Sequence, residues 1–165
     1  MVMNKETLSW NDIEDLTETI IMRMKLDNWF PNLIIGLTRG GLIPASMLSH
    51  ALRVEMSALD VSLRDSRIVT PVTDTRILDW AKKGKKVLVV DDINDSGATF
   101  DWVKKDWIKT LCINEDQWPN EIIKFAALIH NSPSMQPIDY YGRIVNKELD
   151  PIWFEFPFEV WHKNR

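Results

Sequence analysis

The sequence predicts an α/β protein built on an open parallel β-sheet with helices on both faces. Two short, unbroken apolar runs, residues 33–37 and 87–90, are typical of strands buried on both sides in such a sheet. Each run is followed by a turn of small residues and then by apolar side chains at helical spacing. Alternating strands and helices joined by short loops favour this architecture, which binds ligands at the carboxyl ends of its strands.

A capping signal begins the first expected helix. Ser9 is followed three positions later by Asp12, a pairing that satisfies free backbone N–H groups at a helix start. The apolar residues beyond it are spaced to form one stripe, which predicts a helix that packs on the sheet. These residues are Ile13, Leu16, Ile20 and Met24.

The turn after the first apolar run leads into a second expected helix, residues 42–52, where Pro44 suits the first turn. Residues 56–63 then predict a strand. Residues 64–76 are polar, are interrupted by Pro71 and show no periodicity, so we interpret them as a loop.

The second half of the chain repeats the order of strand, loop and helix. After the second apolar run, residues 100–111 carry apolar side chains at helical spacing. Residues 122–129 predict a further strand, and the chain closes with an aromatic segment, residues 153–158.

Length and composition indicate a single compact domain over residues 1–165. A chain of 165 residues buries roughly two-thirds of its unfolded surface without a disulfide or metal to hold it together. The chain is 45% hydrophobic and 27% charged with a formal net charge of -4, so it has no cationic field to attract nucleic acid. We expect no nucleic-acid partner.

The cysteine count favours a reducing compartment, and we expect the cytoplasm. Cys112 is the only cysteine, so neither an intrachain disulfide nor a multi-cysteine metal site can form. The N-terminal stretch lacks a charged head followed by an apolar run, and no later stretch approaches the ~20 apolar residues that span a bilayer. We therefore expect no membrane attachment.

Residues 87–99 are the most informative stretch, because a buried strand runs into Asp91 and Asp92 and then into a small-residue loop that opens a helix. Hydroxyls and free backbone N–H groups at a helix N-terminus hold phosphate dianions. Carboxylates beside a phosphate would repel it unless they bind its sugar hydroxyls or a cation such as Mg²⁺. The stretch therefore predicts a site for a phosphorylated sugar. The loop residues are Ser96, Gly97, Ala98 and Thr99.

This stretch closely resembles the phosphoribosyl pyrophosphate motif of the type I phosphoribosyltransferases: a hydrophobic strand, Asp-Asp, two residues, Asp, Thr or Ser, Gly, any residue, Thr. Only Ser96, where threonine is commoner, departs from it, and a hydroxyl is kept. The resemblance implies that Asp91 and Asp92 bind the ribose 2′ and 3′ hydroxyls and the magnesium ion. It also implies that residues 96–99 bind the 5′-phosphate and that Asp95 is the general base near N7 of a purine.

Residues 36–44 resemble the family's pyrophosphate loop, with Thr38, Arg39 and Gly40 at its centre. The resemblance implies that Arg39 grips the leaving group, because an arginine, backbone N–H groups and Mg²⁺ that converge on a pyrophosphate lower the cost of its departure. The family often has a cis or strained peptide at Thr38–Arg39.

Residues 64–76 lie where the resembled enzymes have a loop that closes over the reaction. Closure excludes water, which would otherwise capture the oxocarbenium-like ribosyl cation. Arg64 and Arg67 could also meet the pyrophosphate, but exposed loop arginines are usually solvated, so we leave both out of the expected catalytic set.

The chain's C-terminal aromatic segment resembles the hood that covers the base in xanthine-guanine and related purine phosphoribosyltransferases. The resemblance implies that Trp153 stacks on the purine and that the main chain around Phe154 reads the edge of the base. The alternative is an aromatic tail that only covers the core. On the hood reading, the core comprises about residues 33–130 and the small hood residues 131–165, to which N-terminal residues could contribute.

One position departs from the family pattern. Many purine members carry a lysine just after the strand that corresponds to residues 122–129, where it donates to the 6-oxo group of the base, and here Asn131 stands there. An amide N–H can donate the same hydrogen bond. We therefore expect a 6-oxopurine acceptor, namely xanthine, guanine or hypoxanthine, and a role in purine salvage.

Two other functions stay open. A regulator of the same fold could bind phosphoribosyl pyrophosphate or a nucleotide without catalysis, although Asp95, Arg39 and the aromatic segment argue against it. A phosphoribosyltransferase acting on a pyrimidine base is the second alternative, disfavoured by Trp153. Because the resembled enzymes are usually dimers or tetramers, we expect a homo-oligomer.

Overall fold

The computed structural model describes residues 4–61 and 75–160. Its centre is a five-stranded sheet in the order β3-β2-β4-β5-β6, and each neighbouring pair of strands is parallel. The strands are β2 (Leu33–Leu37), β3 (Glu55–Leu59), β4 (Val87–Asn94), β5 (Ile123–Asn131) and β6 (Tyr140–Val145).

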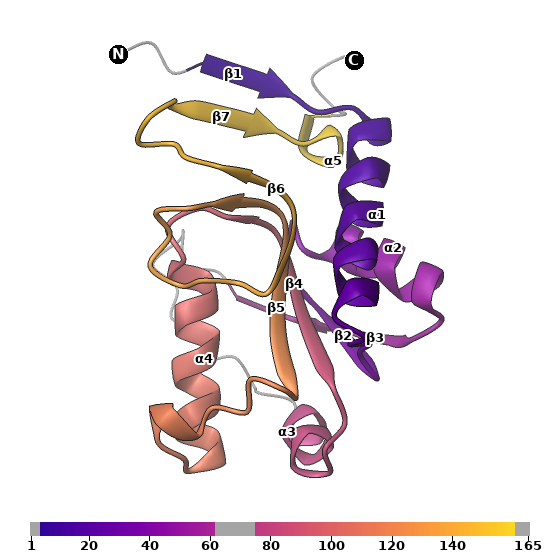
Figure 1. Cartoon of the computed structure of the whole chain (residues 1–165), viewed down its shortest axis with the longest axis vertical. Helices are drawn as coiled ribbons and strands as arrows, with labels where there is room; N and C mark the ends of the chain where they lie inside the picture. Colours follow the sequence, from indigo (N-terminus) through magenta and orange to yellow (C-terminus); the bar gives the residue numbers. More distant parts are fainter. Residues whose placement is uncertain (1–3, 62–74, 161–165) are drawn as a thin grey trace.

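Helices cover both faces of this sheet (Figure 1). Helices α1 (Trp10–Leu26) and α2 (Leu42–Leu52) lie on one face, and α4 (Ala98–Leu111) lies on the other. The remaining helical segments of the described chain are α3 (Thr75–Lys82), the short 3₁₀ helix η1 (Glu115–Gln117) and α5 (Pro157–Val160). The predicted α/β class, an open parallel sheet flanked by helices, is confirmed. No helix in the described ranges is long and apolar enough to cross a bilayer.

The two apolar faces follow from the period of two along each strand. In β4, Leu88 and Val90 join the core cluster beneath α1 and α2, whereas Val87 and Val89 join the cluster beneath α4. The unbroken apolar run that predicted this strand therefore reflects burial on both sides.

The predicted cap of α1 is also confirmed. The Ser9 hydroxyl accepts from the Asp12 backbone N–H at 3.2 Å, and the Asp12 carboxylate accepts from the Ser9 N–H at 2.7 Å. Beyond the cap, Ile13, Ile20 and Met24 are fully buried against the sheet.

A small second sheet joins the two ends of the described chain. Strand β1 (Asn4–Thr7) pairs in parallel with β7 (Ile152–Glu155). Lys5 Nζ lies 2.7 Å from Glu155 Oε2 within this sheet, and Arg143 Nη1 on β6 lies 2.6 Å from Glu6 Oε1. The N-terminal strand thus lies beside the C-terminal aromatic segment (Figure 1).

Strands β3 and β4 end at other residues than predicted, because the length of the neighbouring strand determines where each one stops. Strand β3 stops at Leu59 instead of residue 63, because its partner β2 ends at Leu37, the residue paired with Leu59. Strand β4 continues to Asn94, because its pairing with β5 extends through Asn94 and His130. Asp91 and Asp92 consequently lie within the strand and not after it.

The predicted loop of residues 64–76 lies largely outside the described residues. Its last two positions are helical, because α3 begins at Thr75. Arg64 and Arg67 also lie outside the described residues.

Candidate active site

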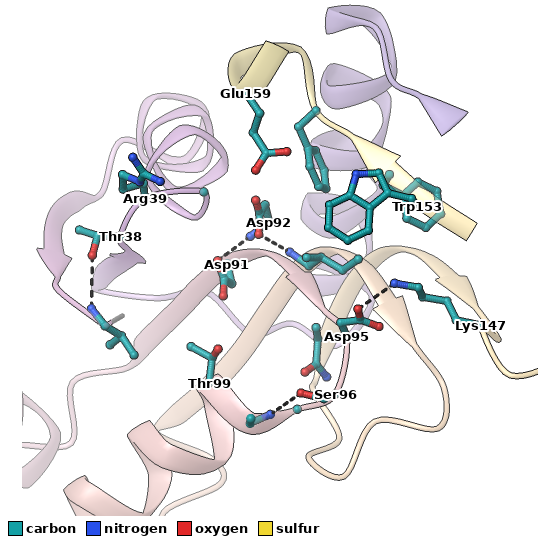
Figure 2. A pocket seen from close by; sticks show the side chains of 18 of the residues that line it. Thr38, Arg39, Asp91, Asp92, Asp95, Ser96, Thr99, Lys147, Trp153 and Glu159 are labelled. Carbon is teal, nitrogen blue, oxygen red and sulfur yellow. Dashed lines mark hydrogen bonds and ion pairs between the residues drawn. The ribbon is translucent and has the colours of Figure 1, made fainter. Parts of the chain in front are cut away.

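An open cavity of about 620 Å³ lies at the carboxyl ends of β2, β3 and β4 (Figure 2). Four parts of the chain line it: the turn between β2 and α2, the two residues after β3, the end of β4 with the loop that follows, and the segment from Lys147 to Glu159. This position agrees with the general rule for open parallel sheets.

The end of β4 places two carboxylates in the cavity. Asp91 and Asp92 are half-buried and line it side by side (Figure 2). Asp91 Oδ1 accepts from the Asp92 N–H at 2.9 Å, and Asp92 Oδ1 accepts from the Ile93 N–H at 2.8 Å. These bonds orient both carboxylates at the wall of the cavity.

The loop after β4 turns sharply into α4 at Gly97. Its φ of 88° is in the left-handed region, which favours glycine. A Cβ there would lie 2.5 Å from both the Gln136 backbone N and the Ser134 Oγ. The Ala98 N–H donates to Ser96 Oγ at 3.3 Å, so the hydroxyl already faces the backbone at the start of α4. Residues 96–99 all line the cavity, as expected of an anion-binding helix start.

A cluster of buried polar side chains supports this loop. The Asn94 Nδ2 donates to His130 Nδ1 at 3.0 Å and to the Gln136 carbonyl at 2.8 Å. Because an amide nitrogen can only donate, His130 Nδ1 must accept and carry no proton. Burial lowers the pKa of His130, which favours the same neutral form. The Ser134 hydroxyl completes the cluster by donating to Asn94 Oδ1 at 3.2 Å.

The turn after β2 forms the opposite side of the cavity. The Thr38–Arg39 peptide is cis, in agreement with the family resemblance. Thr38 Oγ1 donates to Asp60 Oδ1 at 2.6 Å and accepts from the Val61 N–H at 3.3 Å, which ties the turn to the end of β3. A Cβ at Gly40 would overlap the Asp92 carboxylate. The absence of a side chain at residue 40 therefore lets this turn approach the β4 carboxylates.

Aromatic residues of β7 form the upper wall. The Trp153 side chain is 50% exposed and its indole lies above Asp95 (Figure 2), whereas Phe154 is buried at 5%. The pairing of Trp153 with Lys5 of β1 fixes its backbone. An exposed indole face inside a cavity offers a stacking surface for a planar ligand.

Asp95 lies between the loop of residues 96–99 and this aromatic wall, and both Asn131 and Lys147 hold it in place. Asn131 Nδ2 donates to the Asp95 backbone carbonyl at 3.2 Å and to its Oδ1 at 3.3 Å. Lys147 Nζ lies 2.7 Å from Asp95 Oδ2. Asn131 is buried beside the cavity and is not among the described residues that line it, so its predicted contact with a base stays a prediction.

The cavity brings together predicted residues from the turn after β2, the end of β4 with its loop, and the aromatic segment, and it adds three polar residues that sequence reasoning missed. Asp60, Lys147 and Glu159 also line it. Asp60 was missed because the prediction placed it inside the strand of residues 56–63, whereas β3 ends at Leu59 and leaves Asp60 at its carboxyl end. Lys147 and Glu159 carry no local signal, since neither belongs to a motif or to a periodic pattern.

The donor set suits a magnesium ion that arrives with a phosphorylated ligand. Within residues 4–61 and 75–160 there is no cluster of three or more acidic, histidine or cysteine side chains that could hold a metal alone. Mg²⁺ usually binds through one or two carboxylates together with water and substrate phosphates. Asp91 and Asp92 provide such a pair.

Comparisons with known proteins point to one family. The sequence profile described as the phosphoribosyl transferase domain matches residues 4–164. Hypoxanthine-guanine phosphoribosyltransferase of Saccharomyces cerevisiae is 23% identical, with 94% of this chain and 86% of the relative covered. Xanthine-guanine phosphoribosyltransferase of Cereibacter sphaeroides is 26% identical, with coverage of 93% and 86%. A solved purine phosphoribosyltransferase from Pyrococcus horikoshii Ot3 superposes with a TM-score of 0.64 at 30% identity, covering 94% of both chains.

Proposed function

Since the chain belongs to the phosphoribosyltransferase family, we propose that it transfers the 5-phosphoribosyl group of phosphoribosyl pyrophosphate to a purine base. The products are the purine nucleotide and pyrophosphate. One observation carries this proposal: a single cavity places Asp95 between a phosphate-type helix start and the exposed face of Trp153. A ribosyl phosphate and a planar base would meet at this carboxylate.

The ribose-phosphate part of the substrate would bind along the end of β4. Residues 96–99 hold the 5′-phosphate through their hydroxyls and the free N–H groups of α4. Asp91 and Asp92 accept from the 2′ and 3′ hydroxyls. Mg²⁺ held by the same two carboxylates would neutralise charge on the pyrophosphate.

The leaving group would lie toward the turn of Thr38, Arg39 and Gly40. The Arg39 side chain is exposed in the cavity and supplies a fixed positive charge. Backbone N–H groups of the turn add donors as negative charge develops on the departing oxygen.

In the transfer step, N9 of the purine bonds to C1′ as the bond from C1′ to the pyrophosphate oxygen breaks, and its electron pair leaves with the pyrophosphate. The proton on N7 of the base passes to Asp95, which acts as the general base. The hydrogen bonds from Asn131 and the ion pair with Lys147 hold the Asp95 carboxylate in place for this transfer.

The base would be a 6-oxopurine. Trp153 stacks on its face, and the main chain around Phe154 meets its edge. The relatives from Saccharomyces and Cereibacter carry names for hypoxanthine, xanthine and guanine activities, which supports this choice. A role in purine salvage follows if free bases are the acceptors.

We also propose how the domain and its copies are organised. Residues 131–165 form the hood, and β1 contributes to it through its pairing with β7. A homo-oligomer of two or four copies, working in the cytoplasm, is the expected form. Three large apolar side chains on and after α1 are exposed, Met22, Leu26 and Phe30, and they offer a surface for such contacts.

The proposal is tested by incubating the protein with phosphoribosyl pyrophosphate, Mg²⁺ and one base at a time, with measurement of pyrophosphate release and of the nucleotide formed. We expect turnover with one or more of hypoxanthine, guanine and xanthine. An Asp116→Asn variant, changed on the exposed 3₁₀ helix, is the matched control for carboxylate variants of the cavity.

Each contrary outcome identifies one of the alternatives. Turnover with only uracil or orotate would assign the protein to pyrimidine chemistry. Binding of phosphoribosyl pyrophosphate without turnover on any base would indicate a regulator that keeps the fold.

A further inference from the structure

Asn94 is a buried polar residue at the end of β4 to which the proposed chemistry gives no role. It precedes Asp95 in the chain and is only 2% exposed. Burial of an amide is costly unless both of its ends form hydrogen bonds, and an apolar side chain at this position would avoid that cost. The amide therefore matters through the groups that it holds.

The connection from β5 to β6, residues 132–139, lies against the loop that follows β4. The Met135 N–H donates to the Ser96 carbonyl at 3.0 Å. A Cβ at Gly97 would lie 2.5 Å from the Gln136 backbone N, so the two backbones approach closely there. The loop therefore packs directly on the β5–β6 connection.

The amide of Asn94 joins β4 to this connection and to β5. Its Nδ2 donates to the Gln136 carbonyl at 2.8 Å and to His130 Nδ1 at 3.0 Å. Its Oδ1 accepts from the Ser134 hydroxyl at 3.2 Å. Because a carbonyl can only accept, the amide nitrogen must face Gln136, which fixes the orientation of the amide. One side chain thus holds two groups of the β5–β6 connection at the end of β4.

The loop of residues 96–99 depends on such support because its other side is open. These residues line the cavity and would bind the 5′-phosphate through N–H groups at the start of α4. Gly97 has a φ of 88° and, without a Cβ, has access to many other backbone conformations. Backbone donors bind an anion most tightly when they already point toward it, since no binding free energy is then lost on ordering the loop. Contacts behind the loop therefore contribute to phosphate affinity without touching the phosphate.

We propose that Asn94 is a positioning residue for the 5′-phosphate, which holds the loop of residues 96–99 in its binding conformation through the β5–β6 connection. This inference rests on the proposed function for the place of the phosphate. The amide of Asn94 acts on the loop through Ser134 and Gln136 and makes no contact with the ligand. Its loss should weaken binding of the phosphate and leave binding of the base unchanged.

The test compares guanosine monophosphate with guanosine, which share base and ribose and differ by the 5′-phosphate. Calorimetry gives the Kd of each ligand, and the Kd of guanosine divided by that of the monophosphate measures the contribution of the phosphate. The variants are Ser134→Ala, the double variant and Asn94→Leu, which keeps the branched shape of the side chain but forms no hydrogen bond.

Thr17→Val is the matched control. Thr17 is 4% exposed, and its Oγ1 donates to the Ile13 carbonyl at 2.7 Å on α1, outside the cavity. The control therefore removes a hydrogen bond of a buried side chain without changing the site. Any loss of stability that is merely structural should appear in this variant as well.

We expect the parent and Thr17→Val to have the same ratio of Kd values. In Asn94→Leu the ratio should fall by about tenfold or more, because all the hydrogen bonds of the amide are lost. Ser134→Ala removes one of these bonds and should lower the ratio about two- to tenfold. The double variant should lie close to Asn94→Leu, since the amide is the link from the hydroxyl to β4. The Kd of guanosine should stay at the parental value throughout.

Steady-state kinetics give a second readout. In Asn94→Leu the KM for phosphoribosyl pyrophosphate should rise, whereas the KM for the purine should stay near the parental value. A loss of stability without a role in the site would not separate the two constants. Melting curves show whether each variant folds.

Two outcomes would overturn the inference while leaving the proposed function intact. The first is a folded Asn94→Leu protein with the parental ratio or, if that variant does not fold, a parental ratio in Ser134→Ala. The second is an equal weakening of both ligands, which would show a general structural role. A parent protein with a phosphate preference that depends on Asn94, but with no turnover on any base, would instead refute the proposed function alone.

Discussion

At the proposed phosphate end of the cavity, the lining residues are consecutive in one loop, whereas at the proposed base end Asp95 comes from one segment and Lys147 and Trp153 come from another. The shape of the loop at residues 96–99 depends on the turn at Gly97 and the start of α4, which are local in sequence. The base end depends on contacts between residues 36 to 52 positions apart in the chain. Substitutions at the proposed phosphate end should therefore change the binding of the sugar phosphate alone. Substitutions at the proposed base end should change the binding of the base.

The largest expected effect lies at the junction of the two ends. In Asp95→Asn, we expect kcat to fall by about 10²–10⁴, the usual worth of a positioned general base. The Kd of phosphoribosyl pyrophosphate should stay near the parental value, because an amide of the same shape keeps the loop geometry. Steady-state kinetics and calorimetry measure the two quantities. Turnover close to that of the parent would place the base elsewhere.

The next effect belongs to the phosphate end. Asp91→Asn combined with Asp92→Asn should weaken Mg²⁺-dependent binding of phosphoribosyl pyrophosphate by roughly 100-fold or more, since hydrogen bonds to charged groups contribute about 1.5–3 kcal/mol each. Calorimetry with and without Mg²⁺ measures this, and Asp116→Asn is the control. Affinity equal to that of the parent would remove the pair from the sugar and metal site.

A smaller effect should appear at the base end alone. In Trp153→Ala, the KM for the purine should rise by roughly ten- to a hundredfold, because stacking on an aromatic side chain contributes ~1–3 kcal/mol per base. The Kd of phosphoribosyl pyrophosphate should not change. Trp10→Ala removes an indole of equal exposure, 51% against 50%, on α1 outside the cavity. If both variants had the same purine KM, the stacking role would be refuted.

The smallest expected effect concerns His130, which belongs to the buried polar cluster beside the loop that follows β4. Burial lowers the pKa of His130 below its ordinary value of 6.5, so in the window just below 6.5 the unfolded chain binds more protons than the folded one. The contribution of His130 to the free energy of unfolding is therefore complete above this window and is lost as the pH falls through it. Urea unfolding of the parent and of His130→Gln at several pH values tests this. Identical pH dependence in both proteins would exclude His130 as the cause.

The sequence predictions were accurate where neighbouring residues determine the structure and inaccurate where contacts between distant residues determine it. Strands β2 to β5 and the helix that begins at Trp10 were predicted from apolar runs, helical spacing and the Ser9 cap, because these signals depend on neighbouring residues. The ends of β3 and β4 were placed wrongly, because pairing with another strand sets where each one stops. Strands β1, β6 and β7 have mixed sequences and were not predicted as strands.

For this protein, the sequence by itself determined the family resemblance, the α/β class and the loop of residues 96–99 that opens α4, since each of these signals lies in contiguous residues. The tertiary structure alone decided that Lys147 meets Asp95, that Asn131 holds both, and that β1 pairs with β7 behind Trp153. A side chain such as Lys147 in a surface segment carries the same local pattern whether it is solvated or paired. The pairing of β6 with β5 sets Asn131 opposite Val145 and so brings Lys147 beside Asp95 at the proposed base side of the cavity.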